Sequence, residues 1–146
     1  MDLGQLAASM RGHDRGLPSR PATVEAIYAT AHWLLLRERF ADAAKVFRVM
    51  LRVAPRDERA WLGLGECHER IDQLRVAAEL YGAGAVIAAV DGSVSVRCLL
   101  ARARVMSRLG RTHDVDSMLD AAERAAAEQQ SEALAALVDR ERRRVS

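Results

Sequence analysis

Apolar residues recur at helical spacing along nearly the whole chain after residue 22. From Thr23, a candidate N-cap, they follow at intervals of three or four positions: Ile27, Ala31, Leu34 and Leu35. The same spacing predicts further helices over about 40–54, 58–71, 74–90, 94–109, 113–129 and 131–143. Alternating runs of β-branched residues bounded by turns, which are typical of strands, do not occur. The pattern therefore predicts an all-α fold with seven helices.

These helices repeat in pairs with the period of about 34 residues that is typical of a tetratricopeptide superhelix. Residues 58–91 place the characteristic residue types at the right spacing, namely Trp61, Leu64, Gly65, His68, Ala77 and Tyr81. One repeat earlier, over 24–57, the corresponding positions hold Ile27, Ala31, Leu34, Ala43, Phe47 and Pro55. A fainter third repeat fits 96–129, after extra residues near Gly92. The helix at 131–143 would then cap the stack.

Small residues in this pattern predict where the helices of a pair approach closely. Gly65 and Ala43 let the two helices lie against each other, and the rings of Phe47 and Tyr81 fill the remaining space. Trp61 is likewise predicted to be a core residue. Residues 1–22, interrupted by glycine and proline, are predicted to form a flexible N-terminal arm, and 23–146 the repeat domain.

Composition narrows the class of protein. The chain has 146 residues, half of them apolar, and a net charge of only +2, which disfavours a nucleic-acid binder. Its longest uncharged apolar run, over 80–90, is shorter than the roughly 20 residues that span a bilayer. The N-terminal residues lack a signal-peptide pattern and there are only two cysteines, so we expect a cytoplasmic protein in a reducing compartment.

Candidate chemistry is sparse. Cys67 and His68 are adjacent, but neighbouring helical residues diverge by about 100° and no second pair completes a metal-ligand set. Gly82 and Gly84 lie within a predicted helix rather than in a phosphate-binding loop after a strand. We therefore predict neither a cofactor nor a metal site, and no enzymatic activity. The arginines at 140 and 142–144 are interpreted as a solvated helix terminus.

Three strings narrow the family further: VEAIYATAHWLLL at 24–36, RAWLGLGEC at 59–67 and YGAGAV at 81–86. Together with KVF at 45–47, they resemble the class II chaperones of type III secretion systems, the SycD/LcrH type. The resemblance covers about residues 24–125. It implies a chaperone that holds a hydrophobic translocator protein soluble and secretion-competent by binding one extended segment of it. It also implies a homodimer, because the N-terminal arm helps family members to dimerise.

In a tetratricopeptide stack the first helix of each pair lines the concave surface, so certain positions of each repeat face a ligand. They predict a groove that is apolar at its N-terminal end and rich in arginine at the other. The candidate groove residues are Tyr28, His32, Leu35, Leu36, Leu62, Glu66, Glu69, Arg97, Leu100 and Arg104. Tyr28 corresponds to a groove tyrosine of the family. Apolar pockets would seat the segment, while charged residues would fix its register and direction.

Two other functions fit the same sequence. A tetratricopeptide adaptor could clamp an acidic tail of its partner through Arg97, Arg104 and Arg108. A co-chaperone for needle subunits would instead bind an amphipathic helix and need a second small chaperone to stay soluble. Neither alternative involves nucleic acid or stable membrane insertion.

Overall fold

The computed structural model describes residues 20–89 and 92–146, and this part of the chain contains seven α-helices. The helices are α2 (Pro21–Leu36), α3 (Phe40–Val53), α4 (Glu58–Arg70), α5 (Leu74–Ile87), α6 (Val96–Arg108), α7 (Thr112–Glu128) and α8 (Glu132–Val145). The prediction of an all-α fold is confirmed. No helix of the described part is long and apolar enough to cross a membrane.

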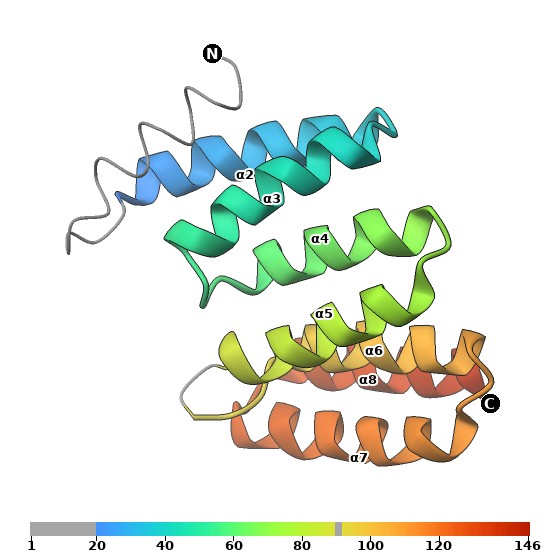
Figure 1. Cartoon of the computed structure of the whole chain (residues 1–146). Helices are drawn as coiled ribbons and strands as arrows, with labels where there is room; N and C mark the ends of the chain where they lie inside the picture. Colours follow the sequence, from blue (N-terminus) through green and yellow to red (C-terminus); the bar gives the residue numbers. More distant parts are fainter. Residues whose placement is uncertain (1–19, 90–91) are drawn as a thin grey trace.

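The helices form a stack of antiparallel pairs, α2 with α3, α4 with α5 and α6 with α7, closed by α8 (Figure 1). The first helices contact one another in the order α2, α4, α6, α8. The second helices of the described part, α3, α5 and α7, make no contact with one another. The first helices contact one another from pair to pair, whereas the described second helices do not. The row of first helices is therefore the inner side of the stack. We call the surface of α2, α4, α6 and α8 the inner face.

One turn geometry links the helices of every pair and also joins α7 to α8. In each turn a residue with positive φ follows the helix, and the next N–H bonds back to a carbonyl of the last helical turn, as in a Schellman motif. The positive-φ residues are Glu38, Asp72, Gly110 and Gln130. The returning bonds are Arg39 N–H to Leu34 O (3.0 Å), Gln73 to His68 (2.9 Å), Arg111 to Met106 (2.9 Å) and Ser131 to Ala126 (3.1 Å).

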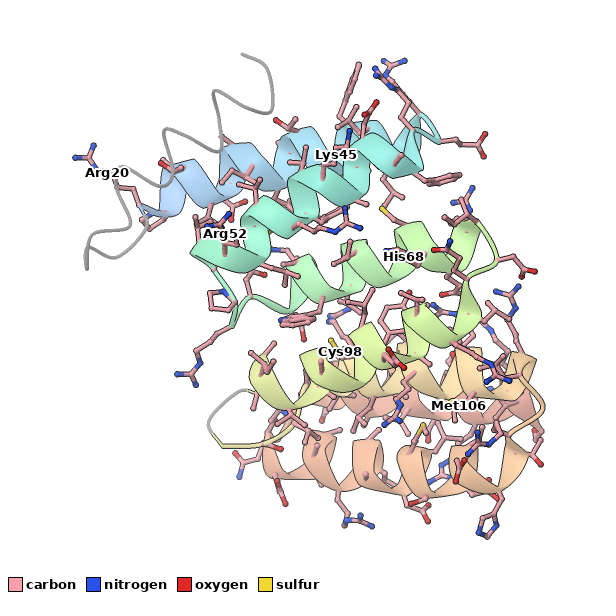
Figure 2. All side chains as sticks on the ribbon, in the orientation of Figure 1. Arg20, Lys45, Arg52, His68, Cys98 and Met106 are labelled. Atoms are coloured by element: carbon pink, nitrogen blue, oxygen red, sulfur yellow. The ribbon has the colours of Figure 1, made fainter. Side chains whose placement is uncertain are left out.

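The beginnings of the helices correct one prediction. The expected N-cap at Thr23 is wrong, because α2 already begins at Pro21, with Arg20 as the residue before it. Proline lacks an N–H that the first turn would leave unpaired, and its fixed φ suits the first helical position. The last residues of the predicted arm are therefore helical, while residues 1–19 lie outside the described residues. Arg20 projects from this end of the stack (Figure 2).

Aromatic rings lie directly over glycines where helices meet. A Cβ on Gly65 would overlap the ring of Tyr81, and a Cβ on Gly63 would overlap the ring of Phe47. Both rings are almost completely buried. The predicted close approach at Gly65 is thus present, and it joins α4 to α5. This contact between Gly65 and Tyr81 lies at the boundary of two core clusters. One cluster is built mainly from α2 to α4 and the other from α5 to α8.

Trp61 differs from its prediction as a simple core residue. Its side chain is only partly buried, and its indole N–H donates a hydrogen bond to the carbonyl of Pro55 at 2.8 Å. Trp61 therefore packs against the second cluster and also ties α4 to the turn that precedes it.

Candidate peptide-binding face

Two cavities lie on the inner face and meet at Glu66, which lines both of them. The α2–α4 cavity has a volume of about 310 Å³ and is lined by His32, Leu35, Leu36, Arg37, Glu38, Glu66 and Arg70. The α4–α8 cavity has a volume of about 370 Å³ and is lined by Leu62, Glu66, Tyr81, Arg97, Leu100, Ala101, Arg104, Leu137, Arg140, Glu141 and Arg144. The two cavities together follow the row of first helices from one end to the other.

Eight of the ten predicted groove residues line these cavities: His32, Leu35, Leu36, Leu62, Glu66, Arg97, Leu100 and Arg104. Tyr28 lines neither cavity but stacks on His32, with 5.5 Å between the ring centroids. Glu69 lines neither cavity and instead bonds to neighbouring helices. The structure thus brings most of the predicted residues together along one face. Their role in binding a segment stays a prediction.

A charged network covers the N-terminal end of the inner face. The guanidinium of Arg59 lies 4.5 Å from the ring centroid of Tyr28 and bonds to Glu25 at 2.6 Å and to Asp57 at 2.7 Å. These hydrogen bonds from Arg59 lower the pKa values of both carboxyl groups and raise the pKa of Arg59. Tyr28 is therefore held between a cation and an exposed histidine, with part of its ring accessible.

The adjacent leucines at the end of α2 have different environments. Leu35 is only 6% exposed and belongs to the core cluster of α2 to α4, whereas Leu36 is 71% exposed. Successive helical residues point about 100° apart, so one of the two faces the core and the other the solvent. Both border the α2–α4 cavity, Leu35 from the core side and Leu36 from the surface.

Glu69 ties the first helices together at the C-terminal end. It accepts hydrogen bonds from Tyr81 Oη (3.0 Å) and Arg104 (2.8 Å) and forms an ion pair with Arg108 (3.2 Å). Burial disfavours the Glu69 carboxylate, but the hydrogen bond and charge of Arg104 outweigh burial, so the pKa of Glu69 is lowered. Glu69 therefore acts as a structural link between α4, α5 and α6.

The predicted arginine group is paired within the chain. Arg97 lies 3.3 Å from Glu58, Arg104 bonds to Glu69, and Arg108 contacts Glu69 and also Asp72 at 3.6 Å. An acidic tail would have to displace these carboxylates to reach the three guanidinium groups. This pairing counts against the adaptor alternative.

Four residues of α8 belong to the inner face although sequence reasoning did not select them: Leu137, Arg140, Glu141 and Arg144. They are spaced i, i+3, i+4 and i+7, so they form one stripe along the helix. α8 was expected only to cap the stack, and its arginines only to be solvated. The signal that could have found them is its place in the order of helices, because a helix after α7 occupies the position of a first helix.

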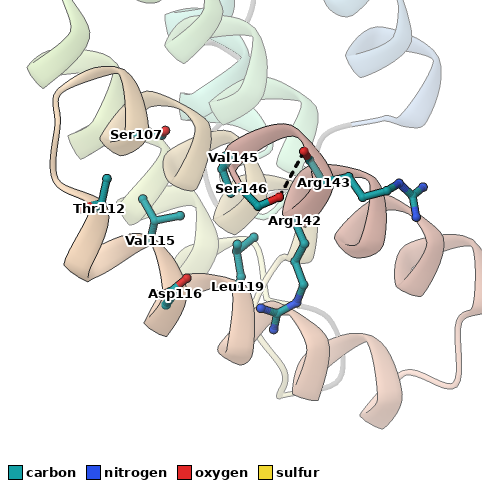
Figure 3. Close-up of a pocket in the computed structure, with 9 residues that line it drawn as sticks. All are labelled: Ser107, Thr112, Val115, Asp116, Leu119, Arg142, Arg143, Val145 and Ser146. Carbon is teal, nitrogen blue, oxygen red and sulfur yellow. Dashed lines mark hydrogen bonds between the residues drawn. The ribbon is translucent and has the colours of Figure 1, made fainter.

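A larger cavity of about 440 Å³ lies between the ends of α6, α7 and α8 (Figure 3). It contains none of the predicted groove residues. Arg142 borders it and links α8 to α7 through Asp120 (2.7 Å) and Glu123 (3.0 Å). One of its lining residues, Arg142, thus holds α8 against α7.

The two cysteines are buried separately. Burial raises the pKa of the Cys67 thiol and of the Cys98 thiol to about 11, so both are protonated at neutral pH and poor nucleophiles. Within residues 20–89 and 92–146, no three His, Cys, Asp or Glu side chains are grouped closely enough to hold a metal ion.

The paired helices, their recurring turn and the continuous row of first helices define a tetratricopeptide-type stack. Comparison with protein-family models gives no match, and comparison with curated proteins gives none either. Solved structures do match. PcrH from Pseudomonas aeruginosa is 26% identical, with a TM-score of 0.71, and the match covers 90% of this chain and 98% of PcrH.

Two further matches are of the same kind. PcrH in complex with the chaperone binding region of PopB is 27% identical, covers 84% of this chain and 97% of that one, and has a TM-score of 0.69. The type III secretion translocator chaperone SycD of Yersinia enterocolitica is 26% identical, covers 82% and 87%, and has a TM-score of 0.70. The predicted resemblance to the type III secretion translocator chaperones is therefore confirmed.

Proposed function

We propose that this chain is a cytoplasmic type III secretion chaperone that binds an extended segment of a hydrophobic translocator along its inner face. The observation that carries the proposal is the pair of cavities that follow the first helices and meet at Glu66. It is supported by the similarity to PcrH, which has been solved with the chaperone binding region of PopB.

The lining suits an extended peptide better than a small metabolite. Apolar side chains lie at intervals along the inner face, with Leu36 near one end and Leu62 and Leu100 toward the other. An extended segment presents alternate side chains to such pockets, which supply most of the binding free energy. Charged residues between the pockets, such as Glu66, would set the register.

A chaperone of this kind needs no covalent chemistry. A translocator carries segments that insert into membranes. When such large apolar segments are exposed in water, they lead to aggregation or to premature insertion. Binding one segment by a few anchors stabilises the soluble form by mass action. We propose accordingly that the protein is not an enzyme and that it functions in the cytoplasm. A homodimer, as the resemblance implies, belongs to the same proposal.

The test is co-expression with any candidate translocator encoded beside this chain, followed by size-exclusion chromatography with light scattering. We expect a soluble stoichiometric complex with the wild type. The complex should be lost when Tyr28→Ala and Leu62→Ala are combined, while circular dichroism shows that this variant is folded. A folded wild type that leaves the cargo insoluble contradicts the proposal. A chain that is soluble only with a second small chaperone favours the needle co-chaperone instead.

A further inference from the structure

The carboxylate of Glu141 is the least satisfied polar group on the inner face. Glu141 is only 7% exposed, and its Oε1 is buried without a hydrogen-bond partner in the described part of the chain. Its Oε2 lies 3.7 Å from Arg144, which is an ion pair but too long for a hydrogen bond. A buried acceptor without a partner lowers stability, so its presence beside a cavity requires an explanation.

Three leucines line the α4–α8 cavity together with this carboxylate. Leu62 comes from α4, Leu100 from α6 and Leu137 from α8, and we call them the leucine triad. Each helix of this part of the inner face thus contributes one branched aliphatic side chain to the same space. The cavity has a volume of about 370 Å³ and combines these leucines with charged side chains, so it can seat one apolar side chain with polar groups around it.

The charges around the cavity indicate which donor Glu141 can accept from. Its lining carries four arginines, Arg97, Arg104, Arg140 and Arg144, against the carboxylates of Glu66 and Glu141. Arg97, Arg104 and Arg144 are paired with Glu58, Glu69 and Glu141, so Arg140 is the lining cation that disfavours a lysine or arginine of the ligand, whereas a neutral N–H meets no such repulsion. Arg140 forms no ion pair with any described residue, so it is free to attract an acidic side chain next to the donor.

An extended segment has such donors at regular intervals, because its main-chain N–H groups are not used within the segment. The terminal torsion of a glutamate side chain is soft and roughly two-fold. Glu141 borders the cavity, so a change of its side-chain rotamer when the segment binds would turn the buried oxygen toward the segment.

We propose that the α4–α8 cavity is a register-setting subsite, in which the leucine triad seats an apolar side chain of the bound segment and Glu141 accepts a hydrogen bond from a main-chain N–H of that segment. This subsite rests on the proposed function, since it needs an extended segment on the inner face. It makes Glu141 a specificity-determining residue, because the hydrogen bond to Glu141 fixes which side chain of the segment lies over the leucine triad.

The experiment uses a fluorescent synthetic peptide of the PopB chaperone binding region and compares Glu141→Leu with Asp139→Leu. Asp139 is an exposed carboxylate on the same helix that has no hydrogen bond or ion pair in the described structure, so it is the matched control. We expect Glu141→Leu to weaken binding roughly 10- to 100-fold, as for loss of a hydrogen bond to a charged group. Its melting temperature should be equal to or above that of the wild type. Asp139→Leu should bind as the wild type does.

A backbone N-methyl scan of the same peptide locates the donor. We expect one N-methylated position to weaken binding to the wild type but to have no further effect on Glu141→Leu, because both changes remove the same bond. If Glu141→Leu does not fold, Glu141→Gln takes its place in the scan, since the amide keeps the shape and weakens the acceptor.

The outcomes separate the two proposals. A wild type that binds the peptide while Glu141→Leu binds it equally well overturns the subsite and leaves the proposed function standing. Weaker binding by Glu141→Leu without any coupled N-methyl position overturns the main-chain donor. A folded wild type that binds neither the peptide nor its methylated forms contradicts the proposed function, and the subsite with it.

Discussion

The two ends of the inner face are built from the same kind of helix pair but present different surfaces. At the N-terminal end, Tyr28, His32 and the exposed Leu36 leave aromatic and aliphatic surface accessible. At the C-terminal end, arginines from α6 are paired with carboxylates from α4, and the accessible apolar surface is confined to a cavity. The first end offers contact area, and the second offers a shaped space with fixed charges.

The difference follows from where equivalent ion pairs lie. Arg59 with Glu25 and Arg104 with Glu69 both join successive first helices across about one repeat. The side chain of Glu25 is 61% exposed, whereas that of Glu69 is 11% exposed. Exposed pairs contribute little to stability, but a nearly buried carboxylate with several donors holds its neighbours firmly. We infer that the C-terminal end carries more of the rigidity of the stack and the N-terminal end more of its adaptable surface.

We expect the largest change in the free energy of unfolding at the contact between Gly65 of α4 and Tyr81 of α5, which lies between the two ends. Gly65→Ala should lower the free energy of unfolding by about 3 kcal/mol, because the new methyl group overlaps the buried ring of Tyr81. Gly82→Ala is the matched control, since its methyl group would meet only the flexible end of Arg102. It should leave stability equal or raise it by about 0.5–1 kcal/mol. Urea unfolding measures both, and equal effects would show that α4 and α5 do not approach as described.

We expect a smaller loss of stability when the nearly buried carboxylate of Glu69 is removed. Glu69→Gln should lower the free energy of unfolding by about 2 kcal/mol, because Arg104 and Arg108 lose their carboxylate. The equivalent change at the other end, Glu25→Gln, should have no measurable effect on unfolding. If the two variants were destabilised equally, the contrast between the ends would be lost.

Acid should weaken the same tie. A carboxyl group with a lowered folded-state pKa stabilises the protein above its unfolded pKa, about 4.3 for glutamate, and that stabilisation is lost as pH falls through the folded value. Stability should therefore fall below about pH 4. Because Glu69 supplies part of this loss, the Glu69→Gln variant should show a shallower decrease in urea-midpoint measurements. A variant as acid-sensitive as the wild type would contradict the role of Glu69.

The smallest effect is expected at the rim of the C-terminal end. Arg108 is exposed, and its pairs with Glu69 and Asp72 lie partly in solvent. Arg108→Ala should lower the free energy of unfolding by less than about 1 kcal/mol. It should also leave the affinity for the proposed cargo segment unchanged. A large loss of affinity for acidic peptides in this variant would instead revive the adaptor alternative.

Most of the fold can be predicted from the sequence, because the repeat places particular residue types at fixed spacings. Gly65 and Tyr81 occur at spacings that only a close helix pair explains, and the structure places them in contact. Sequence reasoning places the start of α2 too late, since it assigns Pro21 to the arm although proline suits the first helical turn. Turn residues such as Glu38 and Asp72, neither of them glycine, gave no signal for the positive φ that they adopt.

The candidate site was less accessible to sequence reasoning. Register alone cannot assign Leu35 to the core and Leu36 to the surface, because that depends on how α2 is rotated against α3 and α4. It also placed Glu69 in the groove, since it cannot show that Arg104 and Tyr81 surround that carboxylate. The contribution of Glu141 depends on the packing of α8 against α6, which no local pattern specifies.

The central claim is that the cargo segment lies on the inner face and not on the outer helices, and two equally exposed residues test it most directly. Leu36 on the α2–α4 cavity is 71% exposed, and Val86 on α5 is 70% exposed. Aspartate at either position should leave the fold intact, which circular dichroism checks. In titrations with a fluorescent peptide of the proposed cargo segment, we expect Leu36→Asp to weaken binding about tenfold or more and Val86→Asp to leave it unchanged. Loss of binding in Val86→Asp with full binding in Leu36→Asp would contradict the account.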